Sequence, residues 1–170
     1  SAYTSAPVPF VAAFTKANPV TADLGRVWTR MLPAERYLFA DAGKGEKPPP
    51  FWSAEFPHAL NAKGEAPDAQ FFEAWEASPF SDDYLGRLAI ASVDALKLGQ
   101  GKGTDFLGIS FSALDLAGHD FGPTSHEVQD TLHGRAVPDH RESRQPRQGV
   151  TVTRHGRRAR LAVEVQPLGL

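Results

Sequence analysis

The hydrophobic positions of this chain separate a helical stretch from a strand-like one. Ser81 is suited to cap a helix, Asp82 and Asp83 favour its positive end, and Gly99 is suited to stop it. Residues 106–111 instead form a short apolar run with aromatic and β-branched members, typical of a strand buried on both faces. A helix followed by a buried strand is half of an α/β layer unit, so we expect an α/β fold with a parallel sheet. The apolar face predicted for the helix over 81–98 contains Leu85, Leu88, Ala89, Ser92, Val93 and Leu96.

Two further helical stretches are expected near the start of the chain. Ser1 to Ala17 has the pattern of an extended entry followed by a short helical turn that ends near Asn18. Residues 21–31 place apolar side chains at i, i+3, i+4 and i+7, which predicts a helix stopped by Pro33. Its apolar face would consist of Leu24, Val27, Trp28 and Met31, with Trp28 packed in the core.

Residues 41–68 are rich in glycine and proline and predict a long loop-like insertion. Long loops inside compact domains are usually functional or cover a site. His58 within this loop has two interpretations, a solvated histidine or a ligand or substrate contact. The aromatic residues that follow also have two, a platform for a planar ring or core packing, and their helical spacing favours the core. They are Phe71, Phe72, Trp75 and Phe80.

Residues whose side chains could bind a metal ion or take part in catalysis concentrate in the stretch 104–129. Asp115 and His119 follow the predicted strand, while Thr124 and Glu127 have the spacing of a capping box for a helix that begins near Ser125. Asp115 and His119 are therefore predicted on a loop at the carboxyl end of a strand, where open α/β sheets bind ligands. Such a pair suits zinc, but a catalytic zinc needs three protein ligands. On spacing alone, a loop-capping aspartate and a surface histidine remain the simpler interpretation.

The string D-x-x-G-H-x-F-G-P from Asp115 to Pro123 resembles the metal motif of the alkaline phosphatase superfamily, in its type I phosphodiesterase/nucleotide pyrophosphatase-like branch. The resemblance implies a partial alkaline-phosphatase-like core, with Asp115 and His119 binding one of two zinc ions that flank a transferred phosphoryl group. It also implies a small-molecule phosphate ester as substrate and a periplasmic or secreted location. The phrase Phe56-Pro57-His58 resembles a family segment that covers the active site.

Other parts that the family uses have no convincing match in this sequence. They are an upstream threonine or serine nucleophile, an Asp-His pair after the next strand, and a late histidine. Asp139-His140 has the right residue types, but no strand-like run precedes it, which favours coincidence. The resemblance therefore implies an internal fragment that is inactive alone.

Composition changes sharply near Leu132. Residues 1–132 carry ten Lys or Arg and seventeen Asp or Glu, a net charge of −7, whereas residues 133–170 carry eight Arg and three acids, a net charge of +5. All seventeen aromatic residues precede residue 122. We therefore divide the chain into a family-like part, 1–132, and a basic tail, 133–170, predicted to be disordered. A shifted reading frame is the favoured cause, and a native basic linker the alternative.

Within this tail, residues 150–153 and 161–165 alternate enough to predict a marginal hairpin. Absence of cysteine excludes disulfides and thiolate metal ligands, and no apolar run approaches the length of a membrane span. Two functions follow: part of a zinc-dependent phosphate ester hydrolase, or a non-catalytic module whose arginines bind an anionic polymer or membrane surface. The tail lacks interleaved aromatics, which argues against specific nucleic-acid recognition. The sequence does not indicate an oligomeric state.

Overall fold

The computed structural model describes residues 8–133, 151–154 and 157–160. Asp139, His140 and most of the arginine-rich tail lie outside these residues. The described elements, in chain order, are α1 (Pro9–Ala17), η1 (Val20–Asp23), β1 (Val27–Trp28), η2 (Ala34–Arg36), β2 (His58–Ala59), α2 (Ala69–Glu76), α3 (Pro79–Ala95), α4 (Ala113–Phe121), α5 (His126–His133), β3 (Thr151–Arg154) and β4 (Arg157–Arg160). Among the helices of these residues, none combines the length and apolar character needed to cross a bilayer.

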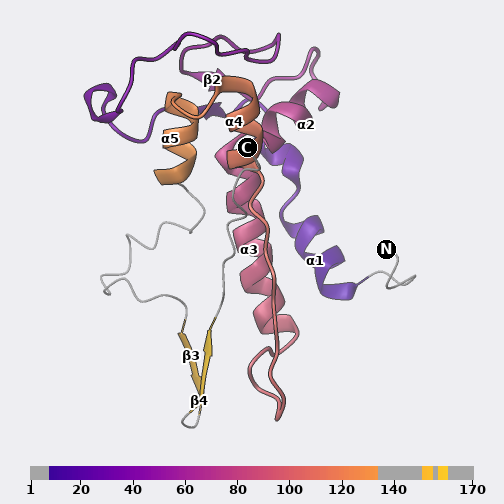
Figure 1. Ribbon diagram of the computed structural model, residues 1–170. Helices are drawn as coiled ribbons and strands as arrows, with labels where there is room; N and C mark the ends of the chain where they lie inside the picture. Colours follow the sequence, from indigo (N-terminus) through magenta and orange to yellow (C-terminus); the bar gives the residue numbers. More distant parts are fainter. Residues whose placement is uncertain (1–7, 134–150, 155–156, 161–170) are drawn as a thin grey trace.

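Helix α3 is the longest described helix; α1, α2 and α4 pack against it, and α5 packs against α4. Figure 1 shows α1 beside it, with α2, α4 and α5 gathered toward its N-terminal end. The predictions for α1 and α3 are confirmed, although α3 begins with Pro79 at the first turn rather than at Ser81. Of the apolar face predicted for α3, only Ala89 is fully buried, and Leu96 is exposed. The helix therefore covers the core with its first half only.

The main hydrophobic core lies between α2, the start of α3, the end of α4 and the long loop. Its buried members are Trp28, Trp52, Leu60, Phe71, Ala74, Ala77, Phe80 and Phe121. Core packing of Trp28 is confirmed, and so is the core interpretation of Phe71 and Phe80, whereas Phe72 points outward and is 42% exposed. The loop-rich character of 41–68 is also confirmed, since β2 is its one regular element among the described residues.

The helix predicted over 21–31 is wrong. Gly25 adopts a φ of 80°, which interrupts a right-handed helix, and η1 ends before it. The chain then extends so that Trp28 pairs with His58 in an antiparallel β1–β2 ladder. Tertiary contacts thus override the helical spacing of the apolar residues.

The strand predicted over 106–111 is also wrong. This segment is extended and runs back along α3 toward α4 (Figure 1), but no described segment pairs with it. Phe106 is 82% exposed. A strand is held by backbone hydrogen bonds to a neighbour, and without one an apolar run remains extended chain. The described sheets are two-stranded and antiparallel, so the expected parallel sheet is not present among these residues.

The hairpin predicted in the tail is confirmed, but its second strand lies at other residues than predicted. β3 and β4 pair antiparallel with Thr151 opposite Arg160 and Arg154 opposite Arg157. The second strand therefore lies at 157–160 rather than at 161–165. This register places a two-residue connection between the strands, the length that hairpins favour.

Candidate metal centre

Asp115 and His119 lie on a helix rather than on the predicted loop. In α4 the buried residues Ala113, Ala117 and Phe121 recur every four positions and face the interior. Asp115 and His119 occupy the outer face, also one turn apart. Gly122 ends the helix with a φ of 83°, a conformation that glycine adopts without strain. The loop prediction failed because the segment is rich in helix-forming alanine and leucine.

The two side chains converge in space. His119 Nε2 and Asp115 Oδ2 are 3.7 Å apart, and the side chains are 74% and 54% exposed. Two ligands of one tetrahedral zinc ion, each bonded at about 2.0–2.2 Å, lie about 3.3–3.6 Å from each other. The observed 3.7 Å lies just beyond this range, so a small rotation of either side chain would place both atoms on one metal ion. Among the described residues, no group of three histidine or acidic side chains could complete such a site.

The next residue, Asp120, is more enclosed than this pair. Burial raises the pKa of Asp120 above its ordinary value of 3.8, and negative Glu73 on α2 raises it further, while His119 lowers it. The backbone carbonyl of Asp120 accepts a 2.7 Å hydrogen bond from the Lys47 amide. The C-terminal end of α4 is therefore tied to the long loop immediately beside His119.

The opposite end of α4 is capped from α3. Ser112 makes no side-chain cap, and Asp82 Oδ1 instead accepts a 3.3 Å hydrogen bond from the Ala113 amide. Burial raises the pKa of Asp82 above 3.8, although the Ala113 and Ser112 amides lower it. Desolvation therefore outweighs the attraction of the helix N-terminus for the ionised carboxylate.

This balance predicts a pH dependence for Asp82→Asn. Because the folded-state pKa of Asp82 is raised, the native chain holds its proton more tightly than the unfolded chain, and stability falls as pH rises from about 4 through the raised pKa. Asparagine keeps the acceptor for Ala113 without ionising. We expect the stability of Asp82→Asn relative to the parent to increase with pH, measured by urea unfolding from about pH 3 to about pH 8. Asp83→Asn, a half-exposed neighbour paired with Arg87, is the control. A difference that is independent of pH would contradict this account.

Behind α4, helix α5 presents a buried polar face made of His126, Glu127 and Asp130. Glu127 Oε1 lies 2.7 Å from His58 Nε2, and both side chains are fully buried. The predicted capping box is wrong. Ser125 Oγ caps α5 by accepting a hydrogen bond from the Val128 amide, while the Glu127 side chain turns inward. The solvated interpretation of His58 is wrong too, since Trp28, Trp52, Phe56 and Phe121 surround its ring.

The other two members of this polar face, His126 and Asp130, bind residues 28–39, which precede the long loop. Arg30 Nε donates to His126 Nδ1 at 3.1 Å, so His126 Nε2 carries the proton and donates to the Phe39 carbonyl at 2.7 Å. The Asp130 carboxylate accepts hydrogen bonds from the Trp28 indole, the Met31 amide and the Tyr37 hydroxyl. Burial raises the pKa of Tyr37 to about 12, and the hydrogen bond to Asp130 adds to the effect. This network was not predicted from the sequence. The feature that could have indicated it is the recurrence of polar residues, His126, Glu127 and Asp130, on one face of the α5 helix.

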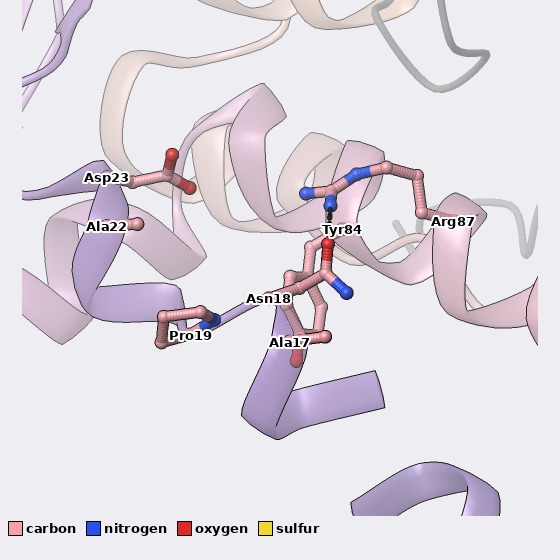
Figure 2. Close-up of a pocket in the computed structure, with 7 residues that line it drawn as sticks. All are labelled: Ala17, Asn18, Pro19, Ala22, Asp23, Tyr84 and Arg87. Atoms are coloured by element: carbon pink, nitrogen blue, oxygen red, sulfur yellow. Dashed lines mark hydrogen bonds between the residues drawn. The ribbon is translucent and has the colours of Figure 1, made fainter. Parts of the chain in front are cut away.

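A cavity among the described residues lies away from the metal pair. It has a volume of about 210 Å³ and lies between the end of α1, η1 and α3. Figure 2 shows its polar side chains, with Arg87 hydrogen-bonded to Asn18. Arg87 also pairs with Asp83, and Asp23 pairs with Arg26. Because these charges already have partners, the exposed pair on α4 is the better candidate site.

Comparisons with known proteins identify relatives. No protein-family profile matches the chain. The alkaline phosphatase PhoV of Synechococcus elongatus is 32% identical over 112 residues, which cover 61% of this chain and 19% of the relative. The alkaline phosphatase PafA of Elizabethkingia meningoseptica is 39% identical over 54 residues, covering 32% of this chain and 10% of PafA.

The structural comparison agrees. A crystal structure of wild-type alkaline phosphatase PafA matches with a TM-score of 0.64 at 28% identity, over 76% of this chain and 25% of that one. The chain thus spans at most about a quarter of the length of the relatives named here. It is therefore related to the alkaline phosphatase superfamily, as a segment of an alkaline-phosphatase-like α/β fold.

Proposed function

We propose that this chain is part of the catalytic domain of a metal-dependent phosphate ester hydrolase, in which Asp115 and His119 bind one metal ion. The observation that carries the proposal is the 3.7 Å separation of His119 Nε2 and Asp115 Oδ2 on the exposed face of α4. The relatives named above are alkaline phosphatases, which supports phosphate ester hydrolysis as the reaction.

Zinc is the proposed metal because a carboxylate and an imidazole belong to its usual ligand set. When bound, a zinc ion acts as a Lewis acid that stabilises negative charge on phosphoryl oxygens. Asp115 would contribute a carboxylate oxygen, and His119 would contribute Nε2 of a neutral imidazole with the proton on Nδ1. The burial of Ala113, Ala117 and Phe121 fixes the face on which both ligands lie.

The finer assignments belong to the same proposal. The D-x-x-G-H-x-F-G-P string supports the type I phosphodiesterase/nucleotide pyrophosphatase-like branch, with a small-molecule phosphate ester as substrate. Export to the periplasm or medium is proposed from the same resemblance.

The isolated 170-residue chain is expected to show no phosphatase turnover. Catalysis requires a positioned nucleophile and preorganised charge stabilisation, and the family's nucleophile and second metal pair have no convincing match in this sequence. The measurement is hydrolysis of p-nitrophenyl phosphate by the pure chain with added zinc, with Asp115→Ala as the control. Zinc-dependent turnover that disappears in Asp115→Ala would show that the chain holds a complete site.

A further inference from the structure

The last turn of α4, which carries His119, is held by residues of the long loop. The Lys47 amide donates to the Asp120 carbonyl at 2.7 Å. Phe121, the next residue, is buried with its ring centroid 5.1 Å from that of His58. The orientation of this turn therefore depends on where the His58 ring lies.

The position of His58 is in turn fixed by α5. Its Nε2 lies 2.7 Å from Glu127 Oε1, and neither side chain is exposed. The same ring packs against Trp52, with centroids 4.8 Å apart, and against Phe56 at 4.7 Å. A chain of direct contacts thus runs from Glu127 through His58 and Phe121 to the turn that carries His119.

Stability alone is a poor explanation for this polar pair. Burying ionisable groups carries a large desolvation cost, and apolar replacements of similar volume are often neutral or stabilising. Here the cost is increased because buried His58 Nδ1 and Glu127 Oε2 have no hydrogen-bond partner. Unlike an apolar contact, the pair supplies a directional hydrogen bond. This bond sets one orientation of the His58 ring.

We propose that Glu127 and His58 are positioning residues for the metal pair. They hold Phe121 and the last turn of α4 so that His119 Nε2 stays within ligand distance of Asp115 Oδ2. This inference rests on the proposed function, because it assigns the pair a role at that same site.

The test compares Glu127→Gln with Glu76→Gln, which makes the same chemical change at an exposed position of α2. Two readouts are taken on the full chain: Co²⁺ affinity by calorimetry with the visible spectrum of bound Co²⁺, and amide hydrogen exchange by NMR. We expect Glu127→Gln to weaken Co²⁺ binding by up to about tenfold, the lower end of the effect of groups bonded directly to metal ligands, because Glu127 acts through His58 and Phe121. We also expect faster exchange at the Gly122 amide, which donates to the Gly118 carbonyl of α4, with the amides of α3 unchanged. Glu76→Gln should change neither.

Unchanged Co²⁺ affinity and unchanged Gly122 exchange in Glu127→Gln would overturn the proposal. Faster exchange across α3 and α4 together would also overturn it, because that is the signature of a merely structural pair. If the parent chain binds no Co²⁺ but Glu127→Gln loses protection at Gly122 alone, the positioning of α4 holds and the proposed function fails. Should Glu127→Gln not fold, the apolar pair His58→Leu with Glu127→Leu replaces it, and an unchanged Co²⁺ affinity in that variant would contradict the inference.

Discussion

Asp130→Ala is expected to lower the free energy of unfolding by about 3 kcal/mol or more, because each buried donor left unpaired costs about 1–3 kcal/mol. The carboxylate accepts from the Trp28 indole and the Met31 amide, both at 2.7 Å, and from the Tyr37 hydroxyl. Asp130 itself is fully buried, so water does not replace the lost acceptor. A small domain has only about 5–15 kcal/mol of stability, so this loss is a large fraction of the total.

Two further variants test whether this loss comes from removing the buried acceptor, with the free energy of unfolding measured in urea. Asp130→Asn keeps one carbonyl acceptor and is expected to cost less than Asp130→Ala. Gln129→Ala removes two hydrogen bonds to the same segment, residues 28–39, one from the Leu38 amide and one to the Arg36 carbonyl, but these bonds are exposed to solvent. We expect it to cost under about 1 kcal/mol, because water replaces the lost partners. Equal losses for Asp130→Ala and Gln129→Ala would show that the buried network does not hold residues 28–39 in place.

The helices with local signals were predictable from the sequence. Helix α3 has acidic residues at its start, and Gly99 beyond its end adopts a φ of 74°. Helix α5 was expected near Ser125, which caps it. In each case the information lies within a few residues of the element, although the capping residues predicted from the sequence, Ser81 for α3 and Thr124 with Glu127 for α5, were wrong.

The segments that failed depend on distant partners. Residues 106–111 have the composition of a strand, but a strand also needs a neighbour, and no described segment provides one. Residues 21–31 have helical spacing, yet Trp28 pairs across β1–β2 with His58. Pattern alone does not reveal a contact that joins residues so far apart.

The same dependence on distant partners explains which residues of the candidate site could be predicted and which could not. Asp115 and His119 were found from spacing and from a resemblance, and their four-residue interval also suits the helix that carries them. The buried polar face of α5 was missed because His126, Glu127 and Asp130 have the composition of a solvated surface. Their partners lie in residues 28–58, and only the folded chain brings them together.

Replacing both Asp115 and His119 by alanine is expected to abolish zinc binding by this chain. The other histidine–carboxylate contacts among the described residues, His58 with Glu127 and His126 with Asp41, both involve buried histidine rings, so the loss should be complete rather than partial. Affinity in the parent chain should be weak, because a catalytic zinc site uses three protein ligands and this pair supplies two. Both side chains are exposed and project from α4, so the double variant should keep its fold and its unfolding transition.

The decisive measurement is a calorimetric titration of zinc into the parent chain, the double variant, and a control in which the exposed His133 is replaced by alanine. The proposal predicts weak binding of one zinc ion in the parent and in His133→Ala, and no binding in Asp115→Ala with His119→Ala. Binding that survives the double substitution, or a parent chain that binds no zinc at any concentration compatible with its fold, would contradict the assignment of this pair as the metal centre.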